Sequence, residues 1–318
     1  MNKLKGIAPI ILAATLMLSS CIKKKDNDTN TDPARQHNED VNNTKSESDN
    51  VNTDINNVLK DAPGFNKKEG TAAYNICGGT VDDSHQYDAT PTLYINFDGS
   101  TACGSPARKR GGQIKLELVQ GARWSDAGAV LRVTHINYKV TFVNLDNHYL
   151  VFNGIKYLTN MTQVNWGTYA LTGNASLQVK ERSYDMMVTF ENGATESWNC
   201  ARLTTVDITA YSTIQVTVNA DTVMNGKNID SWGMTRFNTN FVTEMITPWK
   251  SGTTCGWWRP TQGKYTSTTD KFTVTATAGV NQQGVPVTTG CGAYGYFLEW
   301  QYNDGTNTAS GDLVINYF

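Results

Sequence analysis

The sequence predicts an all-β fold of antiparallel meanders for residues 71–318, packed as a sandwich or as two small β domains. From about Thr71 onward, short runs rich in Thr, Val, Ile, Tyr and Phe alternate apolar with polar residues, which is typical of strands with one buried face. Asn-Gly and Asp-Gly pairs separate several of these runs and accept the positive φ angles of tight hairpins. Strands joined by such short turns must pair antiparallel.

The clearest strands follow one another along the chain, and no sustained helical period is visible in the mature chain. They cover 92–97, 113–119, 130–143, 149–152, 175–180, 186–190, 213–218, 271–276, 296–302 and 312–317. The segments 116–121 and 188–193 share one strand-and-turn pattern, and at the same offset 151–154 matches 223–226. Two related halves, 71–170 and 171–318, and a chance likeness between hairpins both remain open.

The first residues are typical of a secretory signal peptide, which we expect to cover 1–20. Lys3 and Lys5 precede an apolar run at 10–18 that is too short to span a bilayer, and small residues follow it. The ending Leu18-Ser19-Ser20-Cys21 resembles the lipobox of bacterial lipoproteins. That resemblance implies cleavage before Cys21 and lipid on its thiol. The alternative is an ordinary signal peptide in which the cysteine is incidental.

Residues 21–70 are expected to form a disordered tether between the lipid and the β region. From Ile22 to about Asn57 the chain is rich in Asn, Asp, Lys, Thr, Ser and Glu and almost lacks aromatic or large aliphatic residues. Such a segment buries too little apolar area to offset its ordering entropy. As a flexible chain it would have a reach of roughly 35–40 Å.

Composition excludes several classes of partner and chemistry. The formal net charge is −2, and loss of Lys3 and Lys5 with the signal peptide makes it −4, so we expect no nucleic acid as partner. The histidines beyond the tether are scattered, with no metal-ligand spacing, and no hydrolase, phosphate-binding or calcium motif occurs. We therefore expect no catalytic residues, no metal and no cofactor; a carbohydrate-active enzyme is the less favoured alternative.

Five cysteines follow Cys21, and an exported location permits disulfides between them. Cys255 and Cys291 lie beside glycines at strand boundaries and form the first expected pair. Cys77 and Cys103 flank the first convincing strand and form the second. Cys200 is then left as a buried thiol.

The densest aromatic cluster gives the candidate binding site, at Trp257, Trp258 and Arg259. Adjacent strand residues face opposite sides, so one indole should be buried and the other exposed. An exposed indole beside a guanidinium can bind a glycan or another envelope protein; the alternative is that both rings are core. Arg108, Lys109 and Arg110 form the second local cluster, either an anion-binding patch or a solvated loop.

Several segments resemble a family of uncharacterised Bacteroidota lipoproteins. The resemblance rests on 96–99 with Cys103, on 108–114, on 153–154, on the Trp-Arg-Pro segment within 255–263, and on 290–292. Asp98 and Gly112 depart from the family pattern. The resemblance implies an all-β exported fold and brings no catalytic residues.

We accordingly expect a lipid-anchored envelope protein that binds a glycan or an envelope protein, with a structural lipoprotein as the alternative. Residue 22 is isoleucine, not the aspartate that retains some lipoproteins at the inner membrane. This favours the outer membrane, with the domain facing either the periplasm or the cell surface.

Overall fold

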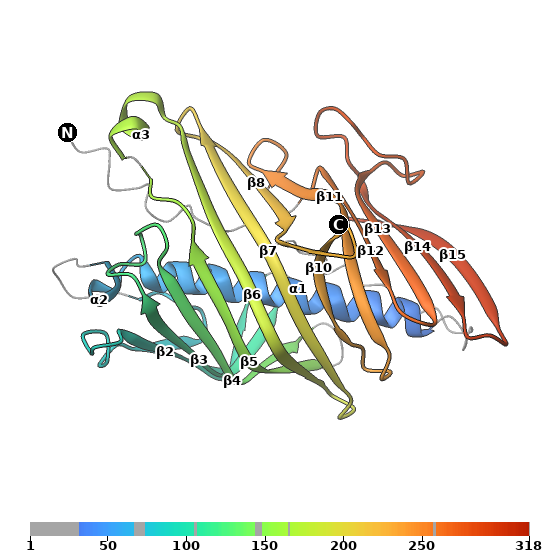
Figure 1. The fold of residues 1–318 in the computed structure, drawn as a ribbon, viewed down its shortest axis with the longest axis horizontal. Coiled ribbons are helices and arrows are strands. Elements are labelled where there is room, and N and C mark those ends of the chain that lie inside the picture. The colour runs from blue at the N-terminus through green and yellow to red at the C-terminus, as the bar shows by residue number, and fades with distance from the viewer. Residues whose placement is uncertain are drawn as a thin grey trace.

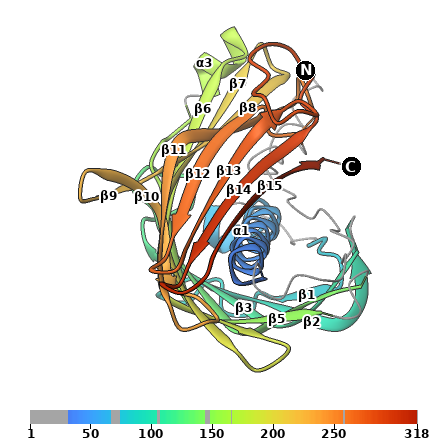
Figure 2. The same cartoon turned by 90° about the vertical axis from the view of Figure 1, so that its right-hand side faces the viewer.

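The computed structural model describes residues 32–66, 74–104, 107–143, 148–164, 166–256 and 259–317. Over these ranges the chain forms one antiparallel β-sheet that curls around a long helix, α1 (Figures 1 and 2). Figure 2, which looks nearly along the helix, shows α1 lying in the concavity of the sheet. The all-β antiparallel class predicted from the sequence is confirmed.

The elements follow in chain order. They are α1 (Asp32–Leu59), α2 (Pro63–Asn66), β1 (Gly79–Asp82), β2 (Thr92–Cys103), β3 (Arg108–Gln120), β4 (Val130–Phe142), β5 (Tyr149–Asn160), α3 (Trp166–Thr172), β6 (Ala175–Phe190), β7 (Thr195–Thr209), β8 (Thr213–Ala220), β9 (Thr222–Met224), β10 (Lys227–Met234), β11 (Asn240–Gly252), β12 (Gln262–Thr268), β13 (Phe272–Val280), β14 (Gly295–Asn303) and β15 (Thr308–Asn316).

The sheet is a meander with one irregularity. Neighbours in the sheet are neighbours in sequence from β1 to β7 and from β10 to β15. β8 and β10 lie end to end between β7 and β11, since β7 pairs with both, and so does β11. The hairpin of β9 and β10 leaves the convex face at this point (Figure 2).

A single curved sheet replaces the sandwich or pair of small domains that the sequence suggested. β5 pairs with β6 along most of its length, so the sheet runs without a break across the boundary proposed near residue 170. One apolar core also joins the two sides of that boundary, because Trp198, Cys200 and Phe241 pack with residues of β2 to β5. The relation between the two halves by duplication stays a prediction.

The expectation of a disordered tether over residues 21–70 is wrong for 32–66, which are helical and largely buried. Pro33 lies in the first turn of α1, where its missing N–H costs no hydrogen bond. Val51, Ile55, Val58 and Leu59 recur at helical spacing and pack into the main core. The rest of the tether lies outside the described residues.

Candidate functional site

The first half of α1 is held by charged side chains of the concave sheet face. Arg236 Nε and Nη2 donate to the two carboxylate oxygens of Asp40, over 2.7 and 2.6 Å. Lys45 forms an ion pair with Asp230 of β10. All four side chains are at least nine-tenths buried, so each charge depends on its partner for the solvation that water no longer supplies.

Arg108 and Arg110 of β3 belong to the same interface. Arg108 Nη1 donates to Glu47 over 3.0 Å, and Arg110 is paired with Asp54. Both guanidiniums are largely buried. The two alternatives for this cluster, an anion-binding patch on the surface and a solvated loop, are therefore wrong for these arginines, because α1 supplies their anions internally.

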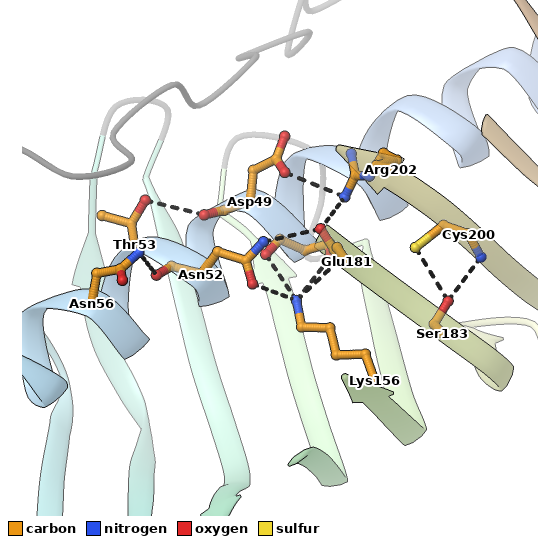
Figure 3. A network of polar contacts seen from close by, with 10 residues as sticks. Asp49, Asn52, Thr53, Asn56, Lys156, Glu181, Ser183, Cys200 and Arg202 are labelled. Carbon is orange, nitrogen blue, oxygen red and sulfur yellow. Dashed lines mark hydrogen bonds and ion pairs between the residues drawn. The ribbon is translucent and has the colours of Figure 1, made fainter. Parts of the chain in front are cut away.

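Figure 3 shows the centre of this interface, where the Glu181 carboxylate accepts hydrogen bonds from four donors. Ser48 Oγ donates to it over 2.7 Å, Asn52 Nδ2 over 3.1 Å, Arg202 Nη2 over 2.9 Å and Lys156 Nζ over 3.3 Å. Burial works to raise the pKa of Glu181, but the two cations and the two hydrogen bonds outweigh it and hold the pKa well below its usual range.

Other titratable groups around α1 are shifted mainly by burial. Burial, aided by Lys45 and Lys156 respectively, lowers the pKa of His37 and of His135 to about 3. Burial raises the pKa of Asp40 and of Asp49 to about 6, against the opposing pull of Arg236 and Arg202.

The cavity between α1 and Trp198, next to His135 and Tyr138, measures about 10 Å³, which accommodates one water molecule. We interpret the network as the means of docking α1.

Both predicted disulfides are confirmed. Cys77 is bonded to Cys103, and Cys255 to Cys291. Cys200 is a buried free thiol, as expected. Burial raises its pKa to about 12, so this thiol does not act as a nucleophile near neutral pH.

The Cys255–Cys291 bond ties the turn after β11 to the segment between β13 and β14, and an open cleft of about 790 Å³ lies against it. Lys264 lines this cleft, while its neighbour Tyr265 points the other way and donates a hydrogen bond to Asn42 of α1. The cleft therefore opens on the sheet face opposite α1. Its lining is rich in hydroxyl and amide groups, including Thr209, Thr213, Gln215, Thr247, Ser251, Thr254, Thr261, Gln262, Thr277 and Thr288.

A second cleft of about 550 Å³ shares Cys291 with the first. Arg259, Asn281, Gln282, Gln283 and Tyr294 are among the residues that line it.

The structure places one of the three predicted binding residues: Arg259, in the second cleft. Trp257, Trp258 and the lipidation candidate Cys21 lie outside the described residues. Of the tryptophans whose exposure is described, Trp198 and Trp249 are buried, and Trp249 stacks on Tyr296.

Sequence reasoning missed the lining of the first cleft, which comes from strands β7, β8 and β11 to β13. A local signal did exist: threonines and Lys264 alternate with mostly apolar residues along β12 and β13. That signal does not reveal which of the strands lie side by side.

Within the described part of the chain, no group of His, Cys, Asp and Glu is arranged to hold a metal ion. No helix found there is long and apolar enough to cross a membrane. The two disulfides indicate an oxidising environment outside the cytoplasm. Comparison of the chain with models of protein families, with curated proteins and with solved structures found no match.

Proposed function

We propose that this protein is a lipid-anchored envelope protein that binds a carbohydrate in the cleft beside the Cys255–Cys291 disulfide. The cleft itself carries the proposal, because it combines a volume of about 790 Å³ with a lining of hydroxyl and amide groups. These groups both donate and accept hydrogen bonds, which matches the hydroxyls of a sugar. A disulfide at its edge supports a preformed shape, which reduces the ordering cost of binding.

The anchoring part of the proposal rests on the signal sequence and on the position of α1. Residues 22–31 stand between Cys21 and α1, and even fully extended they span at most about 35 Å. We propose that the lipid on Cys21 holds the sheet this close to the outer membrane, in keeping with Ile22 and with the resemblance to Bacteroidota lipoproteins.

Anchoring is tested by replacing Cys21 with alanine. The variant is expected to leave the membrane fraction or to accumulate as the uncleaved precursor, and to incorporate no labelled palmitate. Cys200→Ala serves as the control, since it removes a cysteine that is buried in the fold. Label that persists in Cys21→Ala would contradict the assignment.

Carbohydrate binding is tested on a glycan array with variants of the cleft. Gln215 and Gln262 are exposed and line it, so Gln215→Ala and Gln262→Ala should each weaken binding about three- to tenfold, the effect of one lost hydrogen bond. Gln301→Ala, an equally exposed change on β14, should leave binding unchanged. Trp257→Ala and Trp258→Ala show whether an indole adds a stacking surface.

The competing proposals are a protein partner and a structural lipoprotein without a small ligand. The burial of Trp198 and Trp249 favours the structural alternative over a sugar platform built from those rings. A wild-type protein that binds no glycan, together with tryptophan variants that only lower the melting temperature, would replace the carbohydrate proposal with the structural one.

A further inference from the structure

Two lysines lie side by side in the cleft. Lys250 of β11 is paired in register with Gln262 of β12, and Lys264 follows two residues along the same face. Such diagonal neighbours across antiparallel strands are about 7–8 Å apart, within reach of one ligand for side chains as long as lysine. Both residues are partly buried and line the cleft.

Neither ammonium group has an acidic partner among the described residues. The acid that lines the cleft, Asp207, is paired in register with Gln215, whereas Lys250 is paired with Thr217. Strand β8 therefore lies between Asp207 and Lys250, and no ion pair joins these two described residues.

A second acid, Glu244, lies on the face of the sheet that carries Lys264, since its register partner on β12 is Thr266. Its carboxylate is already paired with Lys227 over 2.8 Å. On the α1 side of the sheet the situation is the reverse, because the buried Lys45 and Lys156 both have carboxylate partners. The positive charge of the cleft is therefore left for a ligand.

We propose that the cleft selects an acidic carbohydrate, whose carboxylate, sulfate or phosphate groups are bound by Lys250 and Lys264. The inference rests on the carbohydrate binding proposed above and adds the charge of the ligand. Hydroxyl groups of the surrounding threonines bind the sugar hydroxyls. The two ammonium groups form charge-assisted hydrogen bonds with the acidic groups, and these are stronger than the bonds they form with a neutral sugar.

The experiment compares polysaccharides that differ only in charge, with the whole exported protein at low ionic strength. Polygalacturonate is measured against its methyl ester, and dextran sulfate against dextran, by titration calorimetry. The proposal predicts that at least one acidic member binds ten times or more tighter than its neutral counterpart. The pair that responds distinguishes a carboxylate from a sulfate ester.

The same titrations are repeated with Lys250→Gln/Lys264→Gln and with a matched control, Lys271→Gln. Lys271 is exposed just before β13, at the end of the strands away from the cleft, so the control removes a charge without touching the cleft. The double variant should lose at least tenfold in affinity for the acidic polymer, while Lys271→Gln stays within twofold. Unchanged thermal unfolding shows that the variants are folded.

Each other outcome overturns the inference in a distinguishable way. Equal binding of neutral and acidic polymers, unaffected by the lysine changes, removes the charge selectivity and leaves the proposed function in place. Failure of every polysaccharide and of the glycan array removes both. Equal losses in Lys271→Gln would show attraction to overall charge, and lysine-dependent binding to phosphatidylglycerol vesicles without sugar binding would assign the cleft to a lipid surface.

Discussion

Replacing Arg202 with methionine is expected to lower the free energy of unfolding by about 3–5 kcal/mol, the range found when one partner of a buried ion pair is removed. Arg202 is buried and contacts the carboxylates of Glu181 over 2.9 Å and Asp49 over 3.4 Å. Methionine fills much of the same space, but it leaves the carboxylates of Asp49 and Glu181 with Lys156 as the remaining cation beside them. Urea unfolding at pH 7 measures the loss.

The matched control is Arg132→Met, which breaks an ion pair of similar geometry at the surface. Arg132 Nε and Nη2 donate to Glu117 over 2.7 and 2.6 Å, but the arginine side chain is 37% exposed. Water and salt screen such a pair, so the expected loss is at most about 1 kcal/mol. Similar losses in both variants would show that burial does not increase the contribution of these ion pairs to the free energy of unfolding.

The second large effect is a change in the pH dependence of stability: without the two buried histidines, stability should rise as pH falls from 7 to 4.5. In the folded protein the pKa of His37 and of His135 is about 3, against 6.5 in an unfolded chain. Protons then bind the unfolded state preferentially between these values, so each histidine lowers stability as pH falls from 6.5 toward 3. By pH 5 the loss is about 2 kcal/mol per histidine.

Three carboxyl groups act in the opposite direction over part of this range. The folded pKa of Asp40 and of Asp49 is about 6, and burial raises the pKa of Glu196 well above its ordinary value. The folded state binds their protons first, so these groups raise stability as pH falls toward the unfolded pKa near 4. The gain from these carboxyl groups and the loss from the two histidines nearly cancel, so wild-type stability should be nearly constant between pH 7 and about 4.5.

Below about pH 4 the compensation ends, because the unfolded carboxyl groups are protonated as well. The histidine penalty continues, and the lowered pKa of Glu181 now adds to it, so wild-type stability should fall steeply. In His37→Phe/His135→Phe the carboxyl groups act alone, and stability should rise as pH falls from 7 to 4.5. Melting temperatures across pH 3–7 test this; a double variant whose profile parallels the wild type would contradict it.

The strands show what local sequence can determine. In β2, β3 and β14, alternation of apolar and polar residues and the turns between strands depend on near neighbours, and the predicted strands fall within observed ones. The two disulfides were predictable for a related reason, since flanking glycines and strand boundaries limited the plausible pairs. β7 was missed because consecutive residues on both its faces are buried, from Trp198 to Arg202, which removes the alternation.

The helix α1 shows what only the tertiary structure decided. Its composition alone favours disorder, because an isolated polar helix cannot offset its ordering entropy. Its stability comes from partners far along the chain, such as Arg108 for Glu47 and Arg236 for Asp40. No local pattern encodes those pairings.

Dependence on contacts between distant residues also distinguishes the cluster around Arg259, which the sequence predicted, from the cleft, which it did not. The sequence by itself determined the export signal pattern, the strand content, the disulfide candidates and the cluster around Arg259, all of which depend on short segments. The cleft with Lys250 and Lys264 exists only because β7, β8, β11, β12 and β13 are adjacent in the folded sheet. Among these strands, the pairing of β8 with β11 joins segments that are not neighbours in sequence, so the charge left without a partner there becomes visible only in three dimensions.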